Sequence, residues 1–156
     1  MDIETMAAIG RAGAAAVLGI SALGSAIGTG TAGMAAVGSW KKCYAQSKAA
    51  PFILITFIGA PLSQTIYGMI LMLQINGAID TMVADGATFI AWPLMLSMGI
   101  FGGLGIATSA AYQGKAGAAG ADALAETGQG FGNYLMTIGV VETVALFVLV
   151  FMLILL

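Results

Sequence analysis

A single carboxylate lies inside the most apolar segment of this chain. Glu142 is the only charged residue in the segment 131–156, and it falls near the middle of it. A helix needs about 20 apolar residues to cross the hydrocarbon core of a bilayer, so this segment is long enough to span a membrane. An acidic side chain at that depth is costly unless it is neutralised, and it therefore predicts a functional site.

The composition indicates an integral membrane protein. Of the 156 residues, 60% are hydrophobic and 8% charged, whereas about a quarter of the residues in a soluble domain are charged. The chain has no histidine and only one cysteine, Cys43, which excludes a disulfide framework and a Cys/His transition-metal site. No basic cluster indicates nucleic-acid binding. Because Arg11 interrupts the first apolar segment, we expect a membrane helix there rather than a cleavable signal.

Four apolar stretches predict an all-α membrane protein with four transmembrane helices. None of them shows the alternation that is typical of a membrane barrel strand. Short linkers between long spans favour two tandem antiparallel hairpins, residues 1–78 and 79–156. The expected helices lie at about 7–38, 51–75, 87–124 and 129–156.

Lysines predict the orientation in the membrane. The linker segments 39–50 and 113–130 contain Lys41, Lys42, Lys48 and Lys115, whereas the middle linker contains aspartates and no lysine. Positive residues favour the cytoplasmic side. We therefore expect the linkers 39–50 and 113–130 in the cytoplasm and both termini outside, with Arg11 reaching to the outer interface.

Glycine content distinguishes the two arms of each hairpin. The first and third helices are rich in glycine and alanine, whereas the second and fourth carry bulkier side chains. Small residues let membrane helices approach closely. We expect a closed homo-oligomeric ring with helices one and three inside and helices two and four towards the lipid.

Gln113 is expected at the same depth as Glu142. The two residues are equally far from the turn signal Thr127-Gly128, so two helical arms of equal length bring them together. Each lies about 22 Å from the turn, while half a hydrocarbon core is about 15 Å. The tip of this hairpin is therefore expected to protrude from the membrane by about 7 Å or more.

The second helix adds polar groups at a proline. Pro61 has no N–H, so a carbonyl one turn earlier loses its helical partner. Ser63, Gln64 and Tyr67 follow within two turns and share a helix face, since Tyr67 lies four residues after Ser63 and three after Gln64. The phenol of Tyr67 is placed to donate a hydrogen bond to the carboxylate of Glu142.

These groups form an oxygen-rich set. Ser63, Gln64 and Gln113 supply neutral oxygens, the region of Pro61 supplies a carbonyl, and Glu142 supplies the charge. Several oxygens around one carboxylate favour a hard cation such as Na⁺ over a soft metal. H⁺ is expected to compete for the same carboxylate, and a proton-translocating site is the alternative.

The motifs resemble the K subunit (the membrane proteolipid) of vacuolar-type rotary ATPases in its four-helix form. They are most similar to the sodium-translocating bacterial members. The resemblance covers essentially the whole chain, and it is carried by Val141-Glu142-Thr143, by Pro61-x-Ser63-Gln64-x-x-Tyr67 and by Gln113-Gly114-Lys115.

The resemblance implies the ligand set. It assigns Na⁺ binding to Glu142, Gln113, Gln64, Ser63 and the backbone carbonyl of Ala60, with Tyr67 hydrogen-bonded to Glu142. Serine stands at 63 where threonine is usual, and it keeps the hydroxyl. Leu62 stands where a smaller residue is common. This difference concerns which backbone carbonyl is the ligand and not the set of side-chain ligands.

The resemblance also implies the setting and the partners. It implies a rotor-ring subunit, in a bacterial plasma membrane, that couples ion translocation to ATP hydrolysis or synthesis without being an enzyme itself. The implied partners are further copies of the chain, a stator subunit that supplies an arginine, a central-stalk subunit at the cytoplasmic loops, and the bilayer.

Two other functions compete with this interpretation. The segment 28–33 spells G-x-G-x-x-G, but a dinucleotide site needs a preceding strand, and here the motif lies in a Gly/Ala membrane helix. We therefore expect no nucleotide site. A self-contained channel or secondary transporter is the alternative of another class. Many transporters have inverted repeats, whereas the two hairpins here repeat weakly in the same orientation.

Overall fold

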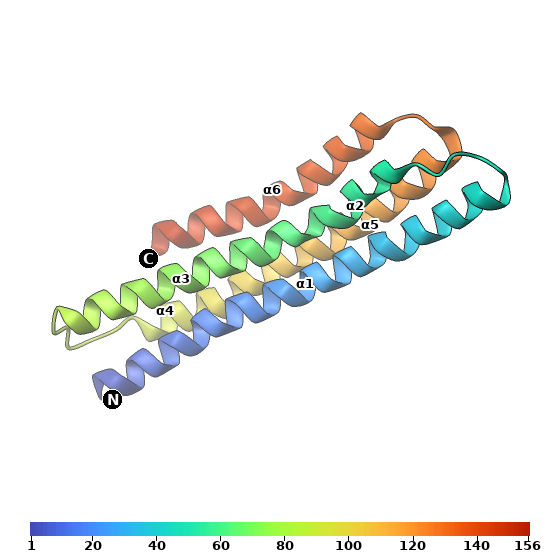
Figure 1. Cartoon of the computed structure of the whole chain (residues 1–156). Coiled ribbons are helices and arrows are strands. Elements are labelled where there is room, and N and C mark those ends of the chain that lie inside the picture. Colours follow the sequence, from blue (N-terminus) through green and yellow to red (C-terminus); the bar gives the residue numbers. More distant parts are fainter.

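The computed structural model describes residues 1–156 as a bundle of long helices (Figure 1). Four helical segments are long and apolar enough to cross a membrane. The first is α1 (Ile3–Ala45) and the last is α6 (Phe131–Leu155). The second consists of η1 (Phe52–Leu54), α2 (Ile55–Gly59), η2 (Ala60–Leu62) and α3 (Ser63–Ala84), and the third of α4 (Trp92–Ser97), the π-helical turn η3 (Met98–Gly102) and α5 (Gly103–Thr127). The predicted class, an all-α membrane protein with two antiparallel hairpins, is confirmed.

The helices are longer and the linkers shorter than predicted. The helix predicted at 7–38 extends from Ile3 to Ala45, and the one predicted at 51–75 continues to Ala84. The third helix lies at 92–127 rather than 87–124, and the last begins at 131 rather than 129. The connecting segments are 46–51, 85–91 and 128–130.

Asp2 explains the early start of α1. Its carboxylate accepts a 2.7 Å hydrogen bond from the backbone N–H of Thr5, which satisfies one of the free donors at the helix terminus. This hydrogen bond lowers the pKa of the Asp2 carboxyl. An acidic side chain at a helix N-terminus also interacts favourably with the helix dipole.

The expected helices at 51–75 and 87–124 left residues 76–86 as the middle linker, and this prediction is wrong because α3 continues to Ala84. Ile75 and Ile79 are fully buried in one core cluster, so the apolar face of α3 continues through this segment. Asp80 lies on the exposed side and forms a 2.6 Å ion pair with Arg11 of α1. Arg11 thus pairs with a residue of the neighbouring helix, and Asp80, one of the residues that indicated a linker, lies on a helix face.

The predicted linker 113–130 is likewise helical up to Thr127. Gln113, Gly117 and Leu124 are buried along one face of α5, and only the segment 128–130 is a turn. Lys115 therefore lies inside α5 rather than in a linker, with its Nζ 4.4 Å from the centre of the Tyr112 ring. The prediction that this end of the bundle faces the cytoplasm now depends on the lysines near the end of α1.

Glycine residues bring α1 and α5 into backbone contact. A Cβ at Gly28 would overlap the carbonyl oxygen of Ala110, and a Cβ at Gly114 would overlap the backbone of Gly28. The G-x-G-x-x-G segment is thus part of a tightly packed helix pair. Such close approaches are typical of small residues in membrane helices.

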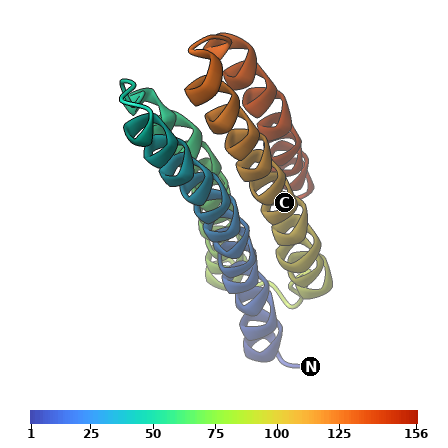
Figure 2. The ribbon, with the colours of Figure 1, turned by 90° about the vertical axis from the view of Figure 1, so that its right-hand side faces the viewer.

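The last helix is the least enclosed. Only Ile138, Ala145 and Leu149 of α6 are buried. Figures 1 and 2 show α6 beside α5 and away from α1, and α6 also contacts α3. At 1.5 Å per residue α1 is about 64 Å long, roughly twice the thickness of a hydrocarbon core, so its ends extend beyond the apolar layer.

Candidate ion-binding site

Pro61 interrupts the second helical segment next to the candidate site. The chain tightens into η2 at this point, and the backbone N–H of Ser63 donates to the carbonyl oxygen of Ala60. The Ser63 hydroxyl lies 3.1 Å from the same Ala60 oxygen and 3.1 Å from Oε1 of Gln64. The 3-10 turn at this proline agrees with the lost helical hydrogen bond expected there, and it brings a backbone oxygen and two polar side chains together.

Two glutamines meet in the interior of the bundle. Gln64 and Gln113 are both fully buried. Nε2 of Gln64 donates a 2.8 Å hydrogen bond to Oε1 of Gln113, which joins α3 to α5. Nε2 of Gln113 in turn lies 3.2 Å from the carbonyl oxygen of Ile138 on α6. Each amide therefore has partners in a region where an unsatisfied polar group would be costly.

Glu142 receives hydrogen bonds from two other helices. The Tyr67 hydroxyl of α3 donates to Oε1 of Glu142 at 2.6 Å. Gln113 of α5 lies 3.3 Å from the other carboxylate oxygen, Oε2. Glu142 itself is half-buried. The expected equal depth of Gln113 and Glu142 agrees with this contact.

The structure brings all six predicted residues together. They form a continuous chain of hydrogen-bonding contacts through Ala60, Ser63, Gln64, Gln113, Glu142 and Tyr67. The acceptor atoms are all oxygens, which suits a hard cation. Turning an amide by half a turn exchanges its oxygen and nitrogen, so both glutamines can present an oxygen to a cation without a change in the backbone. Their role as ligands stays a prediction.

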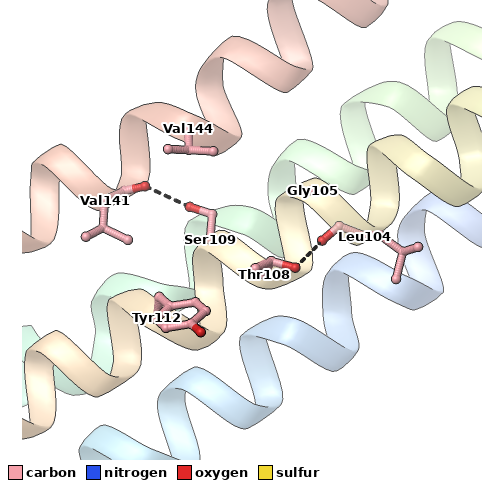
Figure 3. Close-up of a pocket in the computed structure, with 7 residues that line it drawn as sticks. All are labelled: Leu104, Gly105, Thr108, Ser109, Tyr112, Val141 and Val144. Carbon is pink, nitrogen blue, oxygen red and sulfur yellow. Dashed lines mark hydrogen bonds between the residues drawn. The ribbon is translucent and has the colours of Figure 1, made fainter.

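Residue spacing does not reveal one further contact at this site. The hydroxyl of Ser109 on α5 donates a 2.9 Å hydrogen bond to the carbonyl oxygen of Val141, the residue before Glu142. Figure 3 shows this bond across the groove between α5 and α6. Ser109 lies one helical turn before Gln113 and so on the same helix face, but this spacing alone does not show which atom the hydroxyl contacts.

The second hairpin carries the acidic member of this site and one of its two glutamines. Residues 96–155 match the family model of the ATP synthase C subunit. The matched region contains Gln113 and Glu142. Members of this family are ion-translocating proteolipids that form homo-oligomeric rotor rings in ATPase complexes.

The family match supports several predictions at a coarse level. The family is non-catalytic, which agrees with the expectation that this chain is not itself an enzyme. Together with the four apolar helices it indicates an integral membrane protein. No match was found among curated proteins.

Proposed function

We propose that this chain is the rotor-ring subunit of a vacuolar-type ATPase that translocates Na⁺ bound at Glu142. One observation carries the proposal: the carboxylate of Glu142 is joined to Gln113, Gln64 and Ser63 by an unbroken chain of polar contacts. These polar contacts lie within helices that are apolar enough to cross a membrane. Its chemistry is that of an all-oxygen site for a hard cation.

The number of polar groups favours Na⁺ over H⁺. A proton needs only the carboxyl group and one hydrogen-bond acceptor. Two buried glutamines and a serine hydroxyl beside the same carboxylate exceed that need. Each of these groups is costly in an apolar region unless it is satisfied, and a cation with several oxygen ligands gives a reason for all of them.

Each residue then has a defined part. The carboxylate of Glu142, the side-chain oxygens of Ser63, Gln64 and Gln113 and the carbonyl of Ala60 bind the cation. Tyr67 does not bind it; its 2.6 Å hydrogen bond holds one carboxylate oxygen in place.

The charge on Glu142 explains the coupling to rotation. With a bound cation the carboxylate is neutral overall and can face lipid, whereas the free carboxylate needs a cationic partner. Arg11 cannot serve as that partner because it is paired with Asp80 near the N-terminal end of α1. The resemblance to rotary ATPase proteolipids implies that this partner is an arginine from a stator subunit.

The remaining partners are those that the resemblance implies. The chain binds copies of itself in a closed ring, and the central stalk binds the loops 46–51 and 128–130 on the cytoplasmic side. In this account the membrane is a bacterial plasma membrane, and rotation is coupled to ATP hydrolysis or synthesis by other subunits.

Equilibrium binding of radioactive Na⁺ to the purified oligomer tests the proposal. We expect one ion per chain in the parent protein and none in Glu142→Gln. Asp122→Asn is the matched control, since Asp122 is an exposed acid of α5. Equal Na⁺ binding by the parent protein and Glu142→Gln would contradict the sodium site and favour a proton-translocating rotor protein.

A further inference from the structure

Polar contacts hold α6 against α5 at two successive turns. The Ser109 hydroxyl donates to the Val141 carbonyl at 2.9 Å, and Gln113 Nε2 lies 3.2 Å from the Ile138 carbonyl. Ser109 and Gln113 are separated by one helical turn, so they lie on the same face of α5. Two contacts along this face restrict both rotation and sliding of α6, which a single contact would not.

The hydrogen bonds of Tyr67 and Gln113 to Glu142 also join α6 to α3 and α5, but little of α6 is buried. Three of its residues are buried, and between membrane helices apolar burial supplies little driving force, so close packing and hydrogen bonds matter more. Gly105 lies on the same face of α5, close to Val148 of α6. Ser109 is 4% exposed and is the hydroxyl-bearing member of this small-residue face.

The Ser109 contact lies next to the carboxylate that binds the ion. Val141 immediately precedes Glu142, so a bond to the Val141 carbonyl fixes the backbone from which the carboxylate projects. The Glu142 oxygens depend on that position to reach the Tyr67 hydroxyl and the Gln113 amide.

We propose that Ser109 is a positioning residue that sets the cation affinity of Glu142 through its hydrogen bond to Val141. Ser109 does not touch the ion. It holds α6 at the rotation and height at which the carboxylate meets its partners on α3 and α5. This inference rests on the proposed function. It assigns Ser109 as one determinant of the Na⁺ affinity of the site at Glu142.

The neighbouring threonine supplies a matched control. Thr108 lines the same groove, but its hydroxyl donates a 2.7 Å hydrogen bond to the Leu104 carbonyl of its own helix. Figure 3 shows both hydroxyl bonds, one within α5 and one that crosses to α6. Removal of either hydroxyl deletes one hydrogen bond, but only Ser109→Ala removes a bond between α5 and α6.

The test uses the assembled oligomer and a hydrophobic carbodiimide, which reacts with a protonated carboxyl group in an apolar setting. The measured quantity is the Na⁺ concentration that halves the rate of Glu142 labelling. We expect Ser109→Ala to raise it by roughly 3- to 20-fold, the range given by loss of one intramembrane hydrogen bond. Thr108→Ala is expected to leave it unchanged, and Ser109→Thr to keep the parent value because it retains the hydroxyl.

Two outcomes would overturn the inference. In the first, Ser109→Ala and Thr108→Ala have the same half-protecting concentration. In the second, Ser109→Thr is as impaired as Ser109→Ala, which would show that side-chain size rather than the hydroxyl matters. The melting temperature of the oligomer is measured in parallel, since a role limited to stability would lower it without changing the half-protecting concentration.

Failure of the proposed function gives a different result. If Na⁺ does not protect the parent protein, the sodium site is wrong, and the Ser109 inference is then judged on labelling rates without Na⁺. We expect Ser109→Ala to label faster than Thr108→Ala, because Tyr67 and Gln113 hold the carboxyl group less firmly. Equal rates would overturn the inference in that case too.

Discussion

The Tyr67 hydroxyl donates a 2.6 Å hydrogen bond to Oε1 of Glu142 and so ties the second membrane segment to the fourth. In this bond the only O–H donor of the phenol is satisfied, and Oε1 of the carboxylate is the acceptor. It makes the geometry of the carboxylate depend on α3 as well as on α5.

Removal of this phenol should weaken ion binding without preventing assembly. Hydrogen bonds to charged groups contribute about 1.5–3 kcal/mol, so we expect Tyr67→Phe to reduce Na⁺ affinity by roughly tenfold or more. Tyr112→Phe is the control, since Tyr112 is an exposed residue of α5 next to Gln113. Equilibrium Na⁺ binding measures the effect, and equal affinities of the two variants would contradict the assigned role.

Gln64 and Gln113 should behave as ligands rather than only as interhelical contacts. We expect Gln64→Ala and Gln113→Ala each to reduce Na⁺ protection of Glu142 by at least about tenfold, because each loses an oxygen ligand. The melting temperature of each variant is measured alongside. A lower melting temperature with unchanged Na⁺ protection would show that the 2.8 Å bond between the two amides serves packing alone.

Parts of this site can be predicted because they depend on simple geometry. Equal arm lengths from the turn at Gly128 place Gln113 beside Glu142, and the missing N–H of Pro61 requires a break in the second helix. The first feature follows from residue spacing and the second from the chemistry of proline. They need no knowledge of how side chains pack, and the contacts of Gln113 and the turn η2 agree with them.

Other parts depend on packing that residue spacing does not reveal. Asp80 resembles a linker residue in the sequence because the sequence does not show its partner. Its ion pair with Arg11 forms only because α1 and α3 are neighbours in the fold. Ser109 gives no signal of its own because a serine in a Gly/Ala helix is usually a small packing residue. Its contact with Val141 depends on the rotation of α6, which the nearly uniform apolar sequence of that helix does not specify.

Close packing of α1 on α5 predicts a position-dependent effect of added methyl groups. In Gly28→Ala the new Cβ would overlap the Ala110 carbonyl oxygen, whereas Gly38 has no neighbouring atom within 4 Å. We expect Gly28→Ala to destabilise the oligomer by about 1–3 kcal/mol, as overpacking does, and Gly38→Ala to have little effect. Thermal unfolding in detergent measures the difference, and equal melting temperatures would argue against this packing.

The proposed orientation predicts which loops react on each side of the membrane. Ser47 and Thr88 are exposed in the loops 46–51 and 85–91. In a Cys43→Ala background, Ser47→Cys should react with an impermeant maleimide only in inverted vesicles, and Thr88→Cys only in right-side-out vesicles. The reverse pattern would place the lysines near the end of α1 outside and would invert the proposed topology.

Sodium protection of Glu142 against a hydrophobic carbodiimide is the most direct test of the central claim. Na⁺ and H⁺ compete for the carboxylate, so saturating Na⁺ should slow the labelling of Glu142, and the protection should strengthen as the pH rises. Glu142→Gln should abolish labelling while the oligomer stays assembled, which identifies the reacting acid. Equal labelling with and without saturating Na⁺ at neutral pH would contradict a sodium site and would leave a proton as the transported ion.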